Sequence, residues 1–122
     1  MTAIEFVERI RLVVYNATVN SCLSLMQKPP GKRPSAQLQA LSQWFNQLPD
    51  ADKAKVQDVI KLATRQSVFG MFAVLDGVRQ VEDSEKKGVL ELRYCKDGKS
   101  QLINDSNTEP LHDIFNQIVP PE

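Results

Sequence analysis

The residues of this chain that could do chemistry are its single histidine and the carboxylates near it in the sequence. His112 is followed by Asp113 and preceded, across a predicted turn, by Asp105. A carboxylate beside an imidazole can support general acid–base catalysis when both lie in a cleft with a substrate. The sequence shows no cleft, so a surface histidine on a helix is the simpler interpretation.

A second polar pair, Asp76 and Arg79, is separated by one helical turn. Opposite charges at this spacing often form a weak ion pair on a helix surface. The alternative is that both side chains line a polar pocket beside Phe72. The two interpretations stay open at the level of sequence.

The two cysteines, Cys22 and Cys95, match no catalytic or metal-binding pattern. Their separation fits no spacing typical of metal ligands, and nothing places His112 near either thiol as the base of a nucleophilic cysteine. The acidic residues form no spaced metal set, and the sequence contains no phosphate-binding glycine-rich loop and no G-x-S-x-G motif. We therefore predict no catalytic residue, no metal and no cofactor.

Composition and charge argue against several classes of protein. Fifteen basic residues balance 15 acidic ones, and the pI is near 6.6, whereas a nucleic-acid surface usually requires a basic excess. The apolar run at 68–75 is far shorter than the roughly 20 residues of a membrane span. The N-terminus lacks the pattern of a signal peptide. We expect a cytoplasmic protein with reduced thiols and with neither nucleic acid nor membrane as a partner.

The element that must position these residues is a long central helix, predicted over residues 51–80. Its apolar and small residues recur at steps of three and four, which is typical of an amphipathic helix. The opposite face is charged around Arg65 and aromatic at Phe69 and Phe72. Asp76-Gly77 is also a turn signal, but the pattern continues beyond it and favours a continuous helix. The stripe of apolar and small residues comprises Val56, Val59, Ile60, Ala63, Ser67, Gly70, Met71, Val74, Val78 and Val81.

The remaining elements define a mainly helical α+β fold. We expect residues 1–122 to form a single domain in which three helices precede a β-hairpin and a short C-terminal helix. A capping box, T-x-x-E, marks the first helix, and a proline-rich connection separates it from the second. The predicted ranges besides the central helix are helices 3–26 and 35–48, hairpin 89–104 and helix 110–118.

The predicted hairpin is centred on Asp97-Gly98, a dipeptide typical of a type I′ turn. This turn pairs Lys96 with Lys99. A lone two-stranded hairpin is marginally stable in water, so its apolar face must pack on another element. We expect that face to cover Phe72 and its aromatic neighbour, while the first two helices cover the stripe on the other side.

The second half of the chain resembles a family of small bacterial proteins. The resemblance is carried by FGMFAVLDGVRQVED, GVLELRY, LINDS and LHDIFN and extends over residues 41–116. Its most specific parts are VLDG at 74–77 and LHDIFN at 111–116. This is an uncharacterised domain family without an established activity, so the resemblance implies a bacterial, cytoplasmic protein. The polar residues that the resemblance would place in a shared site are Asp76, Arg93, Asn104, His112 and Asp113.

Two classes of function fit these observations. A non-enzymatic protein-binding or regulatory module, such as an adaptor or an immunity-type protein, is favoured because no catalytic constellation is present. Its partner would be another protein or a second copy of the chain, and an exposed hairpin edge could pair with a strand of either. The alternative is a small-ligand-binding or hydrolytic enzyme with a polar pocket around Asp76, Arg93 and His112. The full set of candidate binding residues is Asp76, Arg79, Arg93, Asn104, His112 and Asp113.

Overall fold

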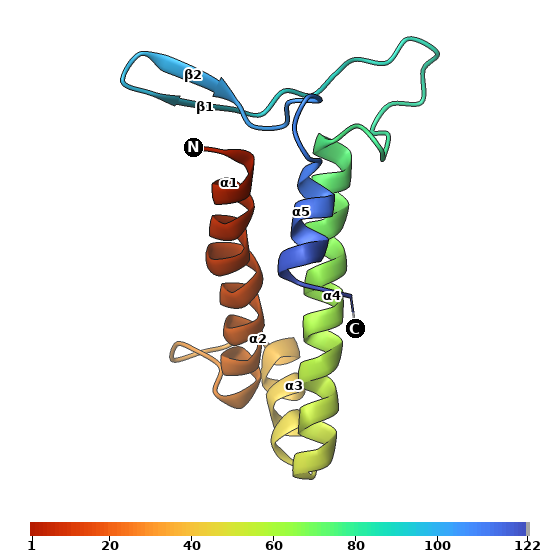
Figure 1. Cartoon of the computed structure of the whole chain (residues 1–122). Coiled ribbons are helices and arrows are strands. Elements are labelled where there is room, and N and C mark those ends of the chain that lie inside the picture. The colour runs from red at the N-terminus through yellow and green to blue at the C-terminus, as the bar shows by residue number, and fades with distance from the viewer. Residues whose placement is uncertain (122) are drawn as a thin grey trace.

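The computed structural model describes residues 1–121 and confirms a mainly helical α+β fold with one antiparallel hairpin (Figure 1). The predicted helices at 3–26, 35–48 and 110–118 agree with the structure within two residues at each end. The elements in chain order are α1 (Ala3–Ile10), the π-helical η1 (Arg11–Asn16), α2 (Ala17–Gln27), α3 (Ala36–Asn46), α4 (Asp50–Leu75), β1 (Arg93–Lys96), β2 (Lys99–Leu102) and α5 (Leu111–Ile118).

The first three elements form one continuous rod that begins at the predicted capping box. Thr2 accepts a hydrogen bond from the backbone of Glu5, and Glu5 accepts one in return. The wider π-helical turns of η1 then shift which side chains face inward. Val7 and Val19 are buried, whereas Val14, which a regular helix would place below Val7, is 39% exposed.

The central helix α4 ends at Leu75, and the prediction that it continues to residue 80 is wrong. Gly77 adopts a φ of +78°, which suits glycine at the end of a helix. Its N–H donates to the carbonyl of Val74 at 3.0 Å, and Val78 donates to the carbonyl of Ala73 at 3.0 Å. These two bonds are those of a Schellman motif, so the Asp76-Gly77 turn signal outweighs the apolar spacing beyond it.

Apart from Gly70, the residues of α4 that the chain buries lie outside the predicted stripe. Its buried side chains include Arg65, Val68 and Phe72, on the face predicted to be charged and aromatic. Val59 and Met71 of the predicted stripe are 64% and 61% exposed. The prediction that the first two helices cover the stripe is therefore wrong at these exposed positions. The first helix packs instead on the aromatic side of α4, where Phe6 contacts Phe72.

The aromatic cluster on α4 is covered by α1 and α5 more than by the hairpin. Phe72 lies edge-on to Phe6 of α1, with ring centroids 6.2 Å apart, and 5.5 Å from Phe115 of α5. The hairpin contributes Ile103, which is 2% exposed, and the half-buried Tyr94 at the margin of this core. The hairpin therefore covers Phe72 only in part, and the prediction that it supplies the main cover is wrong.

The hairpin itself has the predicted turn and register. Asp97 and Gly98 have φ values of 53° and 73°, which fit a type I′ turn. Lys96 pairs with Lys99, as predicted, and the pairing ends at Arg93 with Leu102. The strands are shorter than the predicted hairpin at 89–104.

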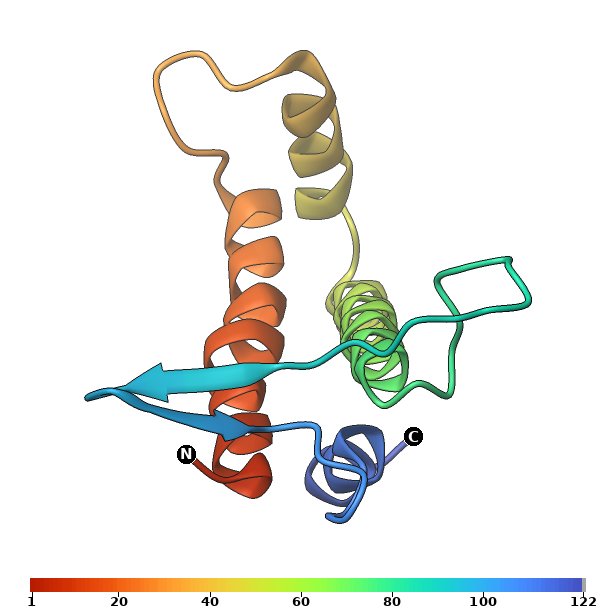
Figure 2. The same ribbon diagram turned by 90° about the horizontal axis from the view of Figure 1, so that it is seen from above.

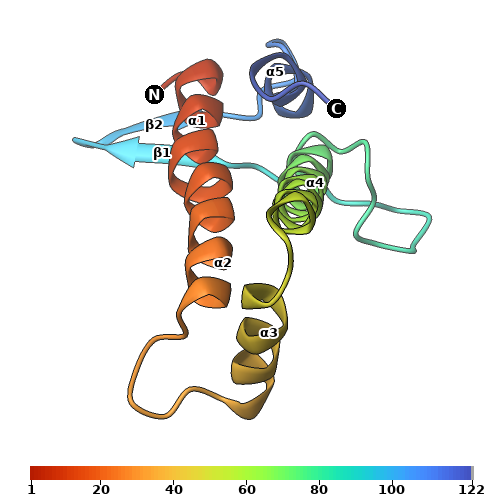
Figure 3. The ribbon, with the colours of Figure 1, turned by 90° about the horizontal axis from the view of Figure 1, so that it is seen from below.

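The long helices diverge, and the core gathers where α5 joins them. α4 is seen nearly end-on in Figure 2, whereas the rod of α1 and α2 lies across the view. Figure 3 shows α5 and the hairpin near the N-terminal end of α1, with α3 at the far end of α2. Every buried residue of α4 lies at Arg65 or beyond it. The first half of this helix is therefore poorly covered by the described chain.

We predict that Phe115→Ala lowers the free energy of unfolding by about 3–5 kcal/mol, because it empties a fully buried aromatic position. Urea denaturation followed by circular dichroism measures the change. Val89→Ala is the control, since Val89 is 88% exposed and should change stability by less than about 0.5 kcal/mol. Equal losses in the two variants would contradict the location of the core.

Candidate functional site

The carboxylate of Asp76, directly after the last residue of α4, caps the start of α5. Its Oδ1 accepts a hydrogen bond from the backbone N–H of Leu111 at 3.0 Å, and its Oδ2 accepts one from the N–H of His112 at 2.9 Å. The first N–H groups of a helix have no partner within the helix, and a carboxylate there also suits the helix dipole. Asp76 therefore supplies to α5 the cap that Pro110, the residue before the helix, does not provide.

The same carboxylate holds the imidazole of His112. Nδ1 of His112 lies 2.6 Å from Oδ2 of Asp76, and Nε2 lies 3.3 Å from a carboxylate oxygen of Asp113. The ring of Phe69 stands at 89° to the imidazole, with centroids 5.6 Å apart. The side chains of Asp76 and His112 are 7% and 16% exposed. A carboxylate–histidine pair is thus present, and both ring nitrogens face carboxylates.

The expected neighbour of His112, Asp105, has a different role. Its Oδ1 accepts hydrogen bonds from the backbone and side-chain nitrogens of Asn107, at 3.0 and 3.2 Å. It shapes the turn before α5, while Asp76, more than thirty residues earlier in the chain, pairs with the histidine. The pair predicted between Asp105 and His112 is therefore wrong.

Asn104 uses its side chain to join three segments of backbone. Its Nδ2 donates to the carbonyl oxygens of Leu75 at 2.6 Å and Leu90 at 2.8 Å, and its Oδ1 accepts from the N–H of Leu92 at 2.8 Å. The end of α4 and both arms of the hairpin are thereby fixed to one another. An amide so fully bonded acts as a structural bridge next to Asp76.

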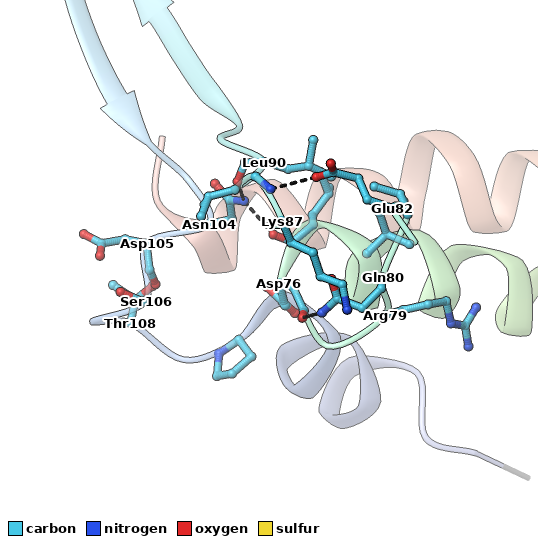
Figure 4. A pocket seen from close by; sticks show the side chains of 17 residues that line it. Asp76, Arg79, Gln80, Glu82, Lys87, Leu90, Asn104, Asp105, Ser106 and Thr108 are labelled. Carbon is cyan, nitrogen blue, oxygen red and sulfur yellow. Dashed lines mark hydrogen bonds between the residues drawn. The ribbon is translucent and has the colours of Figure 1, made fainter. Parts of the chain in front are cut away.

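The two candidate arginines lie apart from the Asp76–His112 pair. Arg79 points away from Asp76 in Figure 4, and its guanidinium lies over Gly70, in the space that a larger side chain there would fill. Arg93 binds Glu91 through Nε at 3.0 Å and Nη2 at 2.5 Å, and both side chains are half exposed. The structure therefore brings Asp76, Asn104, His112 and Asp113 into one region and leaves Arg79 at its margin and Arg93 outside it.

An open pocket of about 520 Å³ lies beside this region, between the end of α4, the loop at 77–90 and the segment at 104–110 (Figure 4). Asp76, Arg79 and Asn104 belong to its lining, whereas Arg93, His112 and Asp113 do not. Further charged groups in the lining are Glu82, Lys87 and Asp105. The pocket thus carries charges of both signs.

Sequence reasoning missed the role of Arg65, which is 6% exposed. Its Nε donates to the carbonyl of Val119 at 3.0 Å, and its Nη2 donates to Oδ1 of Asn116. Its guanidinium also lies 5.8 and 5.7 Å from the ring centres of Phe69 and Phe115. These acceptors and ring faces together offset the free energy that is lost when the guanidinium is removed from water. The aromatic residue one turn after Arg65 was the signal in the sequence that could have indicated this packing.

Within residues 1–121, no group of three or more histidine, cysteine or acidic side chains is arranged to hold a metal ion. No helix in this part of the chain is long and apolar enough to cross a membrane.

No protein-family model, curated protein or solved structure matches this chain. The resemblance to an uncharacterised bacterial domain family therefore remains a prediction, as does the shared site that it implies.

We predict that Asp76→Ala lowers the free energy of unfolding by about 2–3 kcal/mol, because the N-terminal N–H groups of α5 and the imidazole of His112 lose their acceptor. The measurement is urea denaturation of the purified chain. Asp113→Asn is the matched control, since this half-exposed side chain should contribute less than about 0.5 kcal/mol. A larger loss in Asp113→Asn than in Asp76→Ala would contradict the capping role.

Proposed function

We propose that this chain is a non-enzymatic protein-binding or regulatory module of the adaptor or immunity type, and that its binding surface is an apolar stripe on α4. The α4 stripe is defined as Val56, Val59, Ala63, Ser67, Met71 and Val74. Four of its six members are exposed, and the other two are half-buried. An amphipathic helix normally turns its apolar stripe toward a packing partner, and here the described chain supplies little of one.

The accessible surface of the chain carries this proposal. It amounts to 8666 Å², whereas a compact monomer of 13.7 kDa exposes about 6,600 Å². The excess of about 2,000 Å² is larger than the roughly 800 Å² that each partner contributes to a typical specific interface. The chain thus has surface to bury in a complex.

The hairpin edges are less suited to binding than the α4 stripe. Each strand has four residues, and Lys96 and Lys99 flank the turn between them. Short strands and lysine side chains discourage the addition of a further strand. The proposed binding surface is therefore the helix, in place of the hairpin edge that the sequence suggested.

The bonding of Asp76 also supports a non-enzymatic function. Its two carboxylate oxygens accept hydrogen bonds from two backbone groups and lie against the imidazole of His112. A general base must be able to take a proton from a substrate. The carboxylate instead holds a helix and a ring in place, which is a structural task.

Affinity capture from a lysate of the source organism tests the proposal, with tagged wild-type and variant chains as bait. We predict that a partner retained by the wild type is lost when Val59→Lys and Met71→Lys are combined, because two charges then enter the apolar stripe. Val89→Lys is the control, since it places the same charge on an exposed apolar residue of the loop after α4. If every protein retained by the wild type is also retained by the double variant, the stripe is not the binding surface.

A second candidate function is the binding of a small polar molecule in the pocket beside Asp76, and the pocket volume of about 520 Å³ favours it. A thermal-shift screen of charged metabolites would reveal such a ligand. We predict that the stabilisation is weakened by Arg79→Ala, because Arg79 lines the pocket, and is unchanged by Arg93→Ala, because Arg93 does not. Equal effects of the two substitutions would contradict this location.

A further inference from the structure

We infer that the occupant of the α4 stripe is a second copy of this chain, packed antiparallel across a twofold axis. This inference rests on the proposed function, because it identifies the partner of the same surface. Three observations support it: the order of side-chain sizes along the stripe, the area that the chain leaves exposed, and the absence of net charge.

The order of side-chain sizes along the stripe reads the same in both directions. Val59, Ala63, Ser67 and Met71 follow one another at steps of four, which is the spacing of a ridge in helix packing. Their sizes run large, small, small, large. In a symmetric dimer each contact occurs twice, because the same surface meets itself. An antiparallel copy therefore places large residues against large ones and small against small.

In this register Val59 faces the partner's Met71, and Ala63 faces the partner's Ser67. The same arrangement places Val56 opposite the partner's Val74 at the two ends of the contact. Val59, Ala63, Ser67 and Met71 are all exposed in the single chain, so each is accessible for these contacts. Gly70, on the same face, is buried under the guanidinium of Arg79, so the second copy must pack beside that side chain. The small side chains in the middle allow two helix axes to approach within about 8–10 Å.

The hydroxyl of Ser67 does not oppose burial at the centre of this contact. Its Oγ donates to the backbone carbonyl of Ala63 at 2.9 Å. A buried hydroxyl is costly when it has no partner, and here the partner is within the same helix. Ser67 can therefore act as a small residue against a second helix.

Area and charge favour a second copy as the occupant. The excess surface of about 2,000 Å² per chain is more than the roughly 800 Å² that each partner contributes to a typical specific interface, so a second copy can be accommodated. The chain has 15 basic and 15 acidic residues, so two copies do not repel each other through net charge. A strongly charged chain would instead require a partner of the opposite sign.

The first test is the mass of the full chain in solution, by light scattering coupled to size-exclusion chromatography at micromolar concentration. We predict a mass of twice 13.7 kDa. Ala63→Glu should weaken dimerisation at least tenfold, because it buries a charge in the centre of the contact. Val89→Glu, an exposed residue outside the stripe, should leave the dimer intact.

The second test fixes the register by pairing two variants. Ala63→Glu and Ser67→Lys are each expected to be monomeric, and an equimolar mixture is expected to form a heterodimer, because the new glutamate then faces the new lysine across the interface. Recovery of the dimer also shows that both variants fold. A mixture that stays monomeric overturns the antiparallel register.

A monomeric wild-type chain would overturn the inference of a second copy. It would leave the proposed function open, because lysate capture that depends on the stripe would then identify a different protein as the occupant. A dimer that persists in Ala63→Glu would show that another surface holds the two copies together. Loss of both dimerisation and stripe-dependent capture would overturn the inference and the proposed function together.

Discussion

The carboxylate of Asp76 is the constraint on which the arrangement of the helices depends. It follows the last residue of α4 and accepts the first N–H groups of α5, so the end of one helix is fixed to the start of another. Gly77 turns the chain away immediately afterwards, and Asn104 ties the returning hairpin arms to the end of α4. Because a buried carboxylate must be fully hydrogen-bonded, α5 cannot shift along α4 without a large loss in free energy. The other end of α5 is fixed by Arg65.

Two buried polar side chains thus hold α5 against α4, one at each end of α5. Asp76 suits the N-terminal end, where helix N–H groups are exposed, and Arg65 suits the C-terminal end, where carbonyl groups are exposed. The aromatic side chains between them, Phe72 and Phe115, are then buried. The carboxylate–histidine pair is part of this arrangement, because His112 belongs to the helix that Asp76 caps.

The sequence predictions were correct where local interactions determine the structure, and wrong where distant parts of the chain meet. The turn at Asp97-Gly98 and its register were predictable because local backbone geometry determines them. The end of α4 was misjudged because the apolar spacing continues past Gly77, although a glycine there was a sufficient signal. The partner of His112 was misassigned to Asp105 because proximity in sequence was the available guide, whereas the fold brings Asp76 across more than thirty residues. The apolar spacing identified the stripe on α4, but it could not show which face of α4 the rest of the chain covers.

The exposed stripe is a physical consequence of how α5 packs. α5 spans eight residues and α4 spans 26, so α5 can cover one face of the second half of α4 and no more. α1 follows it to the same side, because Phe6 packs on Phe72. The opposite face of α4 still carries Val59 and Met71, whose exposure costs free energy in water. A chain of this length with its core at one end can remove that cost by association. The same cap that organises the fold therefore leaves the α4 stripe exposed, and this is the surface on which we propose that a partner binds.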